Sequence, residues 1–69
     1  MGPLDARVVA GRIIERRKRA GLTQASLARQ AGIRIETLNR IERGKTTPDF
    51  STIRKLMKAV KAAEARVDA

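Results

Sequence analysis

The chain has 69 residues, 16 of them lysine or arginine and 7 aspartate or glutamate, with a net charge of +9, so it is long enough for one small domain. It has no cysteine and no histidine, which excludes disulfides, thiolate metal sites and the commonest general base. The charge favours a polyanionic partner, nucleic acid before an anionic membrane, over a merely solubilising surface.

The first apolar pattern predicts a helix from about Leu4 to Ala20, ended by Gly21. Its inward positions recur at helical intervals and are Val9, Ile13, Arg17 and Ala20. A second helix is expected from Gln24, with Thr23 as its N-cap and Gly32 as its left-handed C-cap. The inward residues of that helix are Leu27, Ala28 and Ala31.

A third helix is predicted from about Ile35 to Arg43, with Leu38 and Ile41 facing inward and Gly44 closing it. Residues 45–49 read as a loop because Pro48 disfavours helix at the residue before it. Asp49 then caps a fourth helix that begins at Phe50. The expected buried face of this helix consists of Ile53, Leu56, Met57 and Val60. Residues 61–69 contain no helix breaker, so they are expected to extend the helix or to serve as a dimerisation tail, with Ala63 and Val67 prolonging its apolar stripe.

The spacing from Gln24 onward is that of a helix-turn-helix. A small residue, Ala28, lets two helices approach, and Gly32 turns the chain sharply. The residues that would lock the angle between the helices are Leu27, Ile33, Leu38 and Ile41. In DNA-binding proteins this arrangement holds the second helix out so that its N-terminal residues enter the major groove. A bundle of several short helices could satisfy parts of the same pattern by chance.

The segment LTQASLARQAGI, followed by TLNRIERGKTTP and FSTIRKLMKAV, resembles the lambda-repressor-like, Cro/cI-type (XRE) helix-turn-helix family over about Ala6 to Val60. The resemblance implies an all-α, compact bundle of four or five short helices within one domain, residues 1–69, whose core is 6–60. It also implies a cytoplasmic prokaryotic or phage transcriptional regulator, expected to be a repressor, that binds a palindromic operator in double-stranded DNA. Five-helix members follow the position of Val60 with a glycine and a short dimerising helix, which this chain does not do.

The resemblance also implies roles for individual residues. Gln24 matches the position that bonds a DNA phosphate and braces the recognition helix. The positions that reach base edges correspond to Arg34, Ile35, Glu36 and Arg40, and Asn39 lies beside them. Where Arg34 stands, the family commonly has a serine or threonine that caps the third helix, so here the cap is expected to be lost or moved. The alternative for Gln24 is an exposed residue in the first turn of its helix. The alternative for the residues expected to reach base edges is an ordinary solvated charged face.

The residue types suit base recognition. Arg34 or Arg40 can donate two hydrogen bonds to guanine, Glu36 can accept from cytosine, and Ile35 can pack on a thymine methyl group. Phosphate contacts are expected from residues on either side of the recognition helix, namely Arg43, Lys45, Thr46, Thr47, Arg12 and Arg16. Solvated loop and helix surface is the alternative for these residues.

One structural pair is also expected. Arg17 falls on the inward side of the first helix, Glu42 follows the core residue Ile41, and the resemblance implies that the two form a partly buried ion pair. The alternative is a plain surface pair, worth less than about 1 kcal/mol.

We expect neither an enzyme nor a cofactor or metal site, because the chain lacks histidine, cysteine, a glycine-rich phosphate loop and paired carboxylates in an apolar setting. No apolar stretch approaches the roughly 18 residues of a membrane span, and the basic run 16–19 lacks the aromatic anchors of membrane-surface helices. No membrane partner is expected.

A second class remains open, an antitoxin or adaptor of the same fold that binds a protein partner such as a toxin. It would show an exposed apolar patch, whose candidates are Val8, Ile14, Ala63 and Val67. The same residues are candidates for a dimer surface, and a homodimer is expected through the C-terminal part of the fourth helix, because one subunit reads only a half-site.

Overall fold

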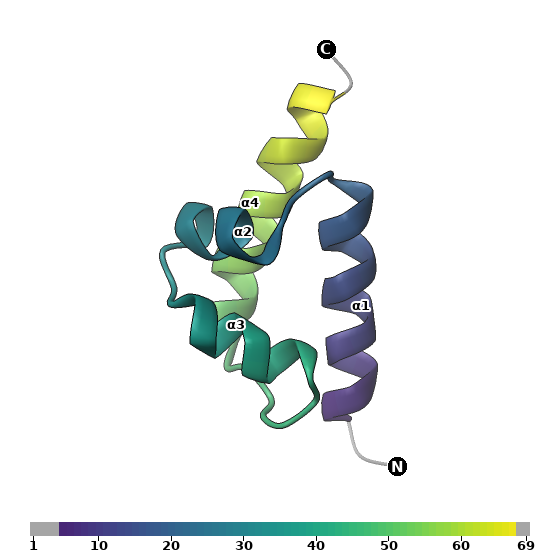
Figure 1. Ribbon diagram of the computed structural model, residues 1–69, viewed down its shortest axis with the longest axis vertical. Helices are drawn as coiled ribbons and strands as arrows, with labels where there is room; N and C mark the ends of the chain where they lie inside the picture. Colours follow the sequence, from purple (N-terminus) through teal and green to yellow (C-terminus); the bar gives the residue numbers. More distant parts are fainter. Residues whose placement is uncertain (1–4, 68–69) are drawn as a thin grey trace.

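The computed structural model describes residues 5–67, and four helices lie in that range (Figure 1). They are α1 (Ala6–Arg19), α2 (Gln24–Ala31), α3 (Ile35–Glu42) and α4 (Phe50–Val67). No strand occurs in this part of the chain, so the predicted all-α class is confirmed. In Figure 1, α1 stands to one side, α4 passes behind α2 and extends beyond it, and α3 lies near the end of the bundle where α1 begins.

The helices begin and end where local chemistry allows. The Thr23 hydroxyl accepts a hydrogen bond from the Ser26 N–H at 3.0 Å, and the Asp49 carboxylate accepts one from the Thr52 N–H at 2.8 Å, so both predicted caps are confirmed. The first helix begins at Ala6, after the N-cap Asp5, whereas the expected start at Leu4 lies outside the described residues. Asp5 directly precedes the helical pattern, and an aspartate in that place indicates a helix that begins at the next residue.

The core is assembled from aliphatic residues of all four helices. Its largest fully buried side chains are Leu27, Leu38, Ile41, Leu56 and Val60. Burying one such side chain contributes about 1.5–3 kcal/mol. The α1 helix adds Ala10 and Ile13 to the buried set, and Ala28 and Ala31 of α2 are small enough to let neighbouring helices approach closely.

The α4 helix departs from expectation in its details. Leu56 and Val60 are buried as predicted, whereas Ile53 and Met57 are only half-buried. The expectation that Ala63 belongs to an exposed patch is wrong: it is 4% exposed and packs in the core cluster, because the apolar stripe of α4 continues past Val60. Of the other patch candidates, Val8 is exposed, Ile14 is half-buried, and the side chain of Val67 lies outside the described residues.

Candidate nucleic-acid interface

The corner between α2 and α3 is built on Gly32. Its backbone is left-handed, with φ 73° and ψ 32°, a conformation that costs little only without a Cβ. The Gly32 N–H donates to the Arg29 carbonyl at 3.2 Å and the Ile33 N–H to the Ala28 carbonyl at 3.0 Å. These two bonds form a Schellman motif, which ends α2 and sends the chain off at a defined angle.

The α3 helix has one buried face and one exposed face. Leu38 and Ile41 are almost completely buried, so the residues on the other side of the helix must point outward. The exposed residues of α3 and its N-cap include Arg34, Ile35, Glu36 and Arg40, while Asn39 is half-buried. The packing of the inner face therefore determines which side chains are available to a partner.

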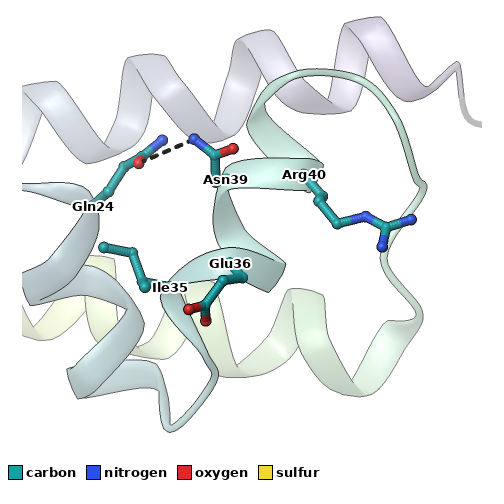
Figure 2. Close-up of a pocket in the computed structure, with 5 residues that line it drawn as sticks. All are labelled: Gln24, Ile35, Glu36, Asn39 and Arg40. Carbon is teal, nitrogen blue, oxygen red and sulfur yellow. Dashed lines mark hydrogen bonds between the residues drawn. The ribbon is translucent and has the colours of Figure 1, made fainter.

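An open hollow of about 340 Å³ lies between the start of α2 and the outer face of α3. It is lined by Gln24, Ile35, Glu36, Asn39 and Arg40 (Figure 2). The structure thus brings together four of the five residues expected to contact bases, with Gln24 beside them. Arg34 does not line the hollow. It is the N-cap of α3 and its side chain makes no capping bond among the described residues, so the expected loss of the cap is confirmed.

Comparison with known families identifies the fold. A family model described as helix-turn-helix matches residues 13–62, more than half of the chain. The chain belongs to the Cro/C1-type helix-turn-helix family. It is therefore a DNA-binding helix-turn-helix domain, and α3 occupies the position of the second helix of the motif, which is called the recognition helix. Searches of curated proteins and of solved structures give no significant match.

A buried ion pair ties the recognition helix to α1. Arg17 Nε donates to Glu42 Oε2 at 2.7 Å and Arg17 Nη2 to Glu42 Oε1 at 3.0 Å. The side chains are only 13% and 4% exposed, respectively. Arg17 Nη1 also donates to the Leu22 carbonyl at 3.1 Å, which satisfies a third guanidinium nitrogen. The two side chains therefore form the pair, shielded from most of the solvent, that the family resemblance implied.

Gln24 joins this pair to the surface of the helix-turn-helix. Its Nε2 donates to Glu42 Oε1 at 2.8 Å, and its Oε1 faces the Asn39 amide nitrogen at 3.5 Å. Gln24 therefore contacts two residues of the recognition helix from α2. The family resemblance implied a bracing role for Gln24. Its two partners lie 18 and 15 residues away along the chain, and no local sequence pattern indicates these contacts.

The residues expected to bind phosphate lie in different environments. Arg43, Lys45 and Thr47 are exposed around the corner that follows the recognition helix, and Thr46 is half-buried. Arg12 is exposed on α1.

Arg16 is less available than expected, because its Nη2 donates to Glu64 Oε1 at 3.3 Å and its side chain is 32% exposed. Arg7, which the sequence analysis did not single out, is exposed and lines a hollow of about 260 Å³ together with Arg43 and Gly44. The first turn of α1 therefore offers a cation next to the end of the recognition helix.

Two further properties concern the described residues alone. Within residues 5–67, His, Cys, Asp and Glu side chains form no group of three or more that could hold a metal ion. None of the helices in that range combines the length and the apolar character needed to cross a membrane.

Proposed function

We propose that the protein is a sequence-specific transcriptional regulator, acting as a repressor, that reads the major groove of double-stranded DNA with α3. The observation that carries this proposal is the two-faced packing of α3. Leu38 and Ile41 anchor it in the core, and its polar residues surround an open hollow at the protein surface. A helix held in this way can present its exposed face to base edges without losing its own packing.

Each exposed side chain suits a particular base. Arg40 and Arg34 carry the planar donor pair that matches N7 and O6 of guanine. Glu36, an acceptor, suits the amino group of cytosine, and Ile35, 42% exposed, suits the methyl group of thymine. Each good contact of this kind contributes about 1–3 kcal/mol of discrimination.

Phosphate contacts would add affinity without specificity. We assign them to Arg12, Arg43, Lys45, Thr46 and Thr47, with a donor from Gln24. Arg16 would contribute only after release from Glu64. The logarithm of the binding constant should fall with the logarithm of the salt concentration, with a slope of about −0.9 for each phosphate neutralised. A flat response to salt would contradict these assignments.

A single recognition helix covers only a few base pairs, so specific regulation requires two copies with half-sites about 34 Å apart. We propose a homodimer through the C-terminal part of α4, acting in the cytoplasm of a prokaryotic cell on chromosomal or phage DNA. The exposed side of that helix includes Ala62 and Ala65, small residues that allow a second helix to approach. Light scattering at micromolar concentration, with and without a palindromic duplex, tests this. A monomer under both conditions would contradict it.

One observation favours the second candidate, an antitoxin or adaptor. Phe50 and Val8 are 80% and 55% exposed, and neither lines the hollow at the recognition helix. Exposed apolar groups of this size suit a protein partner such as a toxin. The two functions are compatible, because a domain that binds a partner elsewhere keeps its DNA-facing side free.

The decisive experiment is selection of bound duplexes from a random pool. The wild-type protein should enrich a palindromic motif, and Arg40→Ala should relax the preference at one position of each half-site while leaving the others. Failure to enrich any motif would contradict the proposed function. A uniform loss of affinity in Arg40→Ala would show that Arg40 contacts phosphate rather than a base.

A further inference from the structure

The Glu42 carboxylate dictates how the Gln24 amide is turned. An ionised carboxylate offers only hydrogen-bond acceptors, and that of Glu42 already receives two bonds from Arg17. The group of Gln24 that faces it at 2.8 Å must therefore be the NH₂ group. With the side chain of Glu42 only 4% exposed, little solvent competes for that acceptor.

The orientation of Gln24 in turn determines that of Asn39. Because the Gln24 NH₂ group faces Glu42, its Oε1 faces Asn39 at 3.5 Å. This distance exceeds the roughly 2.7–3.2 Å of typical N–H···O hydrogen bonds, so the two groups make a weak electrostatic contact. The opposite orientation of Asn39 would place two amide oxygens against each other, which is unfavourable at any such distance. Figure 2 shows the result: the Asn39 nitrogen points toward Gln24 and its oxygen points away.

We propose that Glu42 is a positioning residue for base recognition, acting through Gln24 to turn the Asn39 amide so that α3 selects adenine. This inference rests on the proposed function, since it requires α3 in the major groove. One N–H of Asn39 faces Gln24, which leaves Oδ1 and the second N–H for DNA. Adenine presents the complementary pair, a donor at N6 and an acceptor at N7.

The same geometry disfavours the other purine. Guanine presents two acceptors, N7 and O6, in the major groove. One free N–H of Asn39 can satisfy one of them, but Oδ1 then faces the second acceptor. A phosphate, which also has only acceptors, would leave Oδ1 equally unmatched. The chain Arg17–Glu42–Gln24–Asn39 thus links a buried charge to the base preference of an exposed residue.

The experiment uses a duplex carrying the selected motif, and three others that differ from it only at the base pair where Asn39→Ala relaxes the selection. Fluorescence anisotropy gives the four dissociation constants. Wild-type protein should prefer the adenine duplex by roughly 5- to 150-fold, the ratio that corresponds to 1–3 kcal/mol. Gln24→Met keeps the Arg17–Glu42 pair but removes the amide between it and Asn39, so its preference should fall toward equal binding.

Glu42→Gln is the second variant, since its own amide can present either an oxygen or a nitrogen to Gln24. Its adenine preference should also fall. The ratio of affinities is the informative quantity because partial unfolding weakens binding to all four duplexes alike. Arg40→Ala, which leaves the chain of hydrogen bonds intact, is the matched control and should retain the adenine preference while relaxing a different position.

Two results would overturn the inference while the proposed function stands. One is a full adenine preference in both Gln24→Met and Glu42→Gln. The other is an Asn39→Ala variant that binds every duplex more weakly by the same factor, as loss of a phosphate contact would produce. A wild-type protein with no sequence preference at any position would overturn the proposed function as well.

Discussion

The end of α3 and the C-terminal part of α4 are held by different kinds of contact. At the end of α3, the side chain of Glu42 is 4% exposed and receives hydrogen bonds from both Arg17 and Gln24. Toward the end of α4, Ala63 is buried, but the ion pair there, Arg16 to Glu64 at 3.3 Å, joins side chains that are 32% and 31% exposed.

The difference shows which part of this small protein is held in a narrowly defined geometry. A buried, bidentate pair tolerates few geometries, because each charge depends on its partner for solvation. A half-exposed pair can exchange its partner for water at little cost. The rigid contacts surround the residues proposed to read DNA, and the looser ones lie at the end of α4 that we propose for dimerisation.

The largest expected effect comes from breaking the buried pair. Arg17→Met or Glu42→Leu alone should lower the free energy of unfolding by about 3–5 kcal/mol, because each leaves one uncompensated charge in the core. The double variant should lose less than the sum of the two. Urea denaturation followed by circular dichroism measures all three, with Glu15→Gln in the exposed Arg19–Glu15 pair as control. Unfolding of all three like the wild type would refute a stabilising buried pair.

A smaller effect is expected from the glycine of the corner. Gly32→Ala should cost about 1–2 kcal/mol, the penalty of placing a Cβ residue in left-handed backbone. A Cβ at Gly32 meets no described atom beyond its chain neighbours within 4 Å, so the cost arises in the left-handed backbone itself rather than from a clash with another helix. Gly11→Ala is the matched control: it has equal space but lies inside α1, so it should stabilise by about 0.5–1 kcal/mol. If thermal melts show that Gly32→Ala and Gly11→Ala shift the melting temperature in the same direction, this explanation is contradicted.

At the end of α4, loss of the ion pair should change stability little. Glu64→Gln is expected to lower the free energy of unfolding by less than about 1 kcal/mol, since both partners remain partly solvated. The same urea measurement, repeated at high salt, should show the difference shrinking further. If Glu64→Gln lowers the free energy of unfolding as much as Glu42→Leu does, the ion pair at the end of α4 is as important for stability as the buried pair, and the contrast between the two regions fails.

The start of α4 gives the smallest and most specific test, a dependence on pH. The hydrogen bond from the Thr52 backbone N–H lowers the pKa of the Asp49 carboxyl below its usual value of 3.8. A lowered folded-state pKa means that the stabilisation is present above the unfolded value and is lost as pH falls through the folded one. Thermal melts of wild type and Asp49→Asn, from about pH 5 to about pH 2, should therefore converge at low pH. A constant difference would exclude this linkage.

The parts of the fold that the sequence predicted are those decided within one turn of chain. The Thr23 and Asp49 hydroxyl and carboxylate oxygens cap backbone groups three residues away, and Gly32 receives its conformation from its own lack of a Cβ. The inward residues of α2 and α3 follow from helical periodicity alone. These features need no knowledge of the neighbouring helix.

The parts that could not be predicted join residues distant in the chain. Arg16 meets Glu64 across 48 positions, so a side chain expected to be free for phosphate is partly occupied. The pairing of Arg17 with Glu42 followed from the family resemblance rather than from spacing. For Ala63 the sequence allowed two outcomes, a continued apolar stripe or an exposed patch, and the packing of α4 against the other helices decided for the first.

The sequence by itself determined four helices, the caps at Thr23 and Asp49 and a glycine corner, since these depend on backbone conformation and on contacts over one turn. Only the tertiary structure decided how Glu42 turns the amide of Gln24 and which residues share the hollow beside the recognition helix. Those arrangements depend on the angles at which the helices pack, and the angles are a property of the whole core rather than of any one segment.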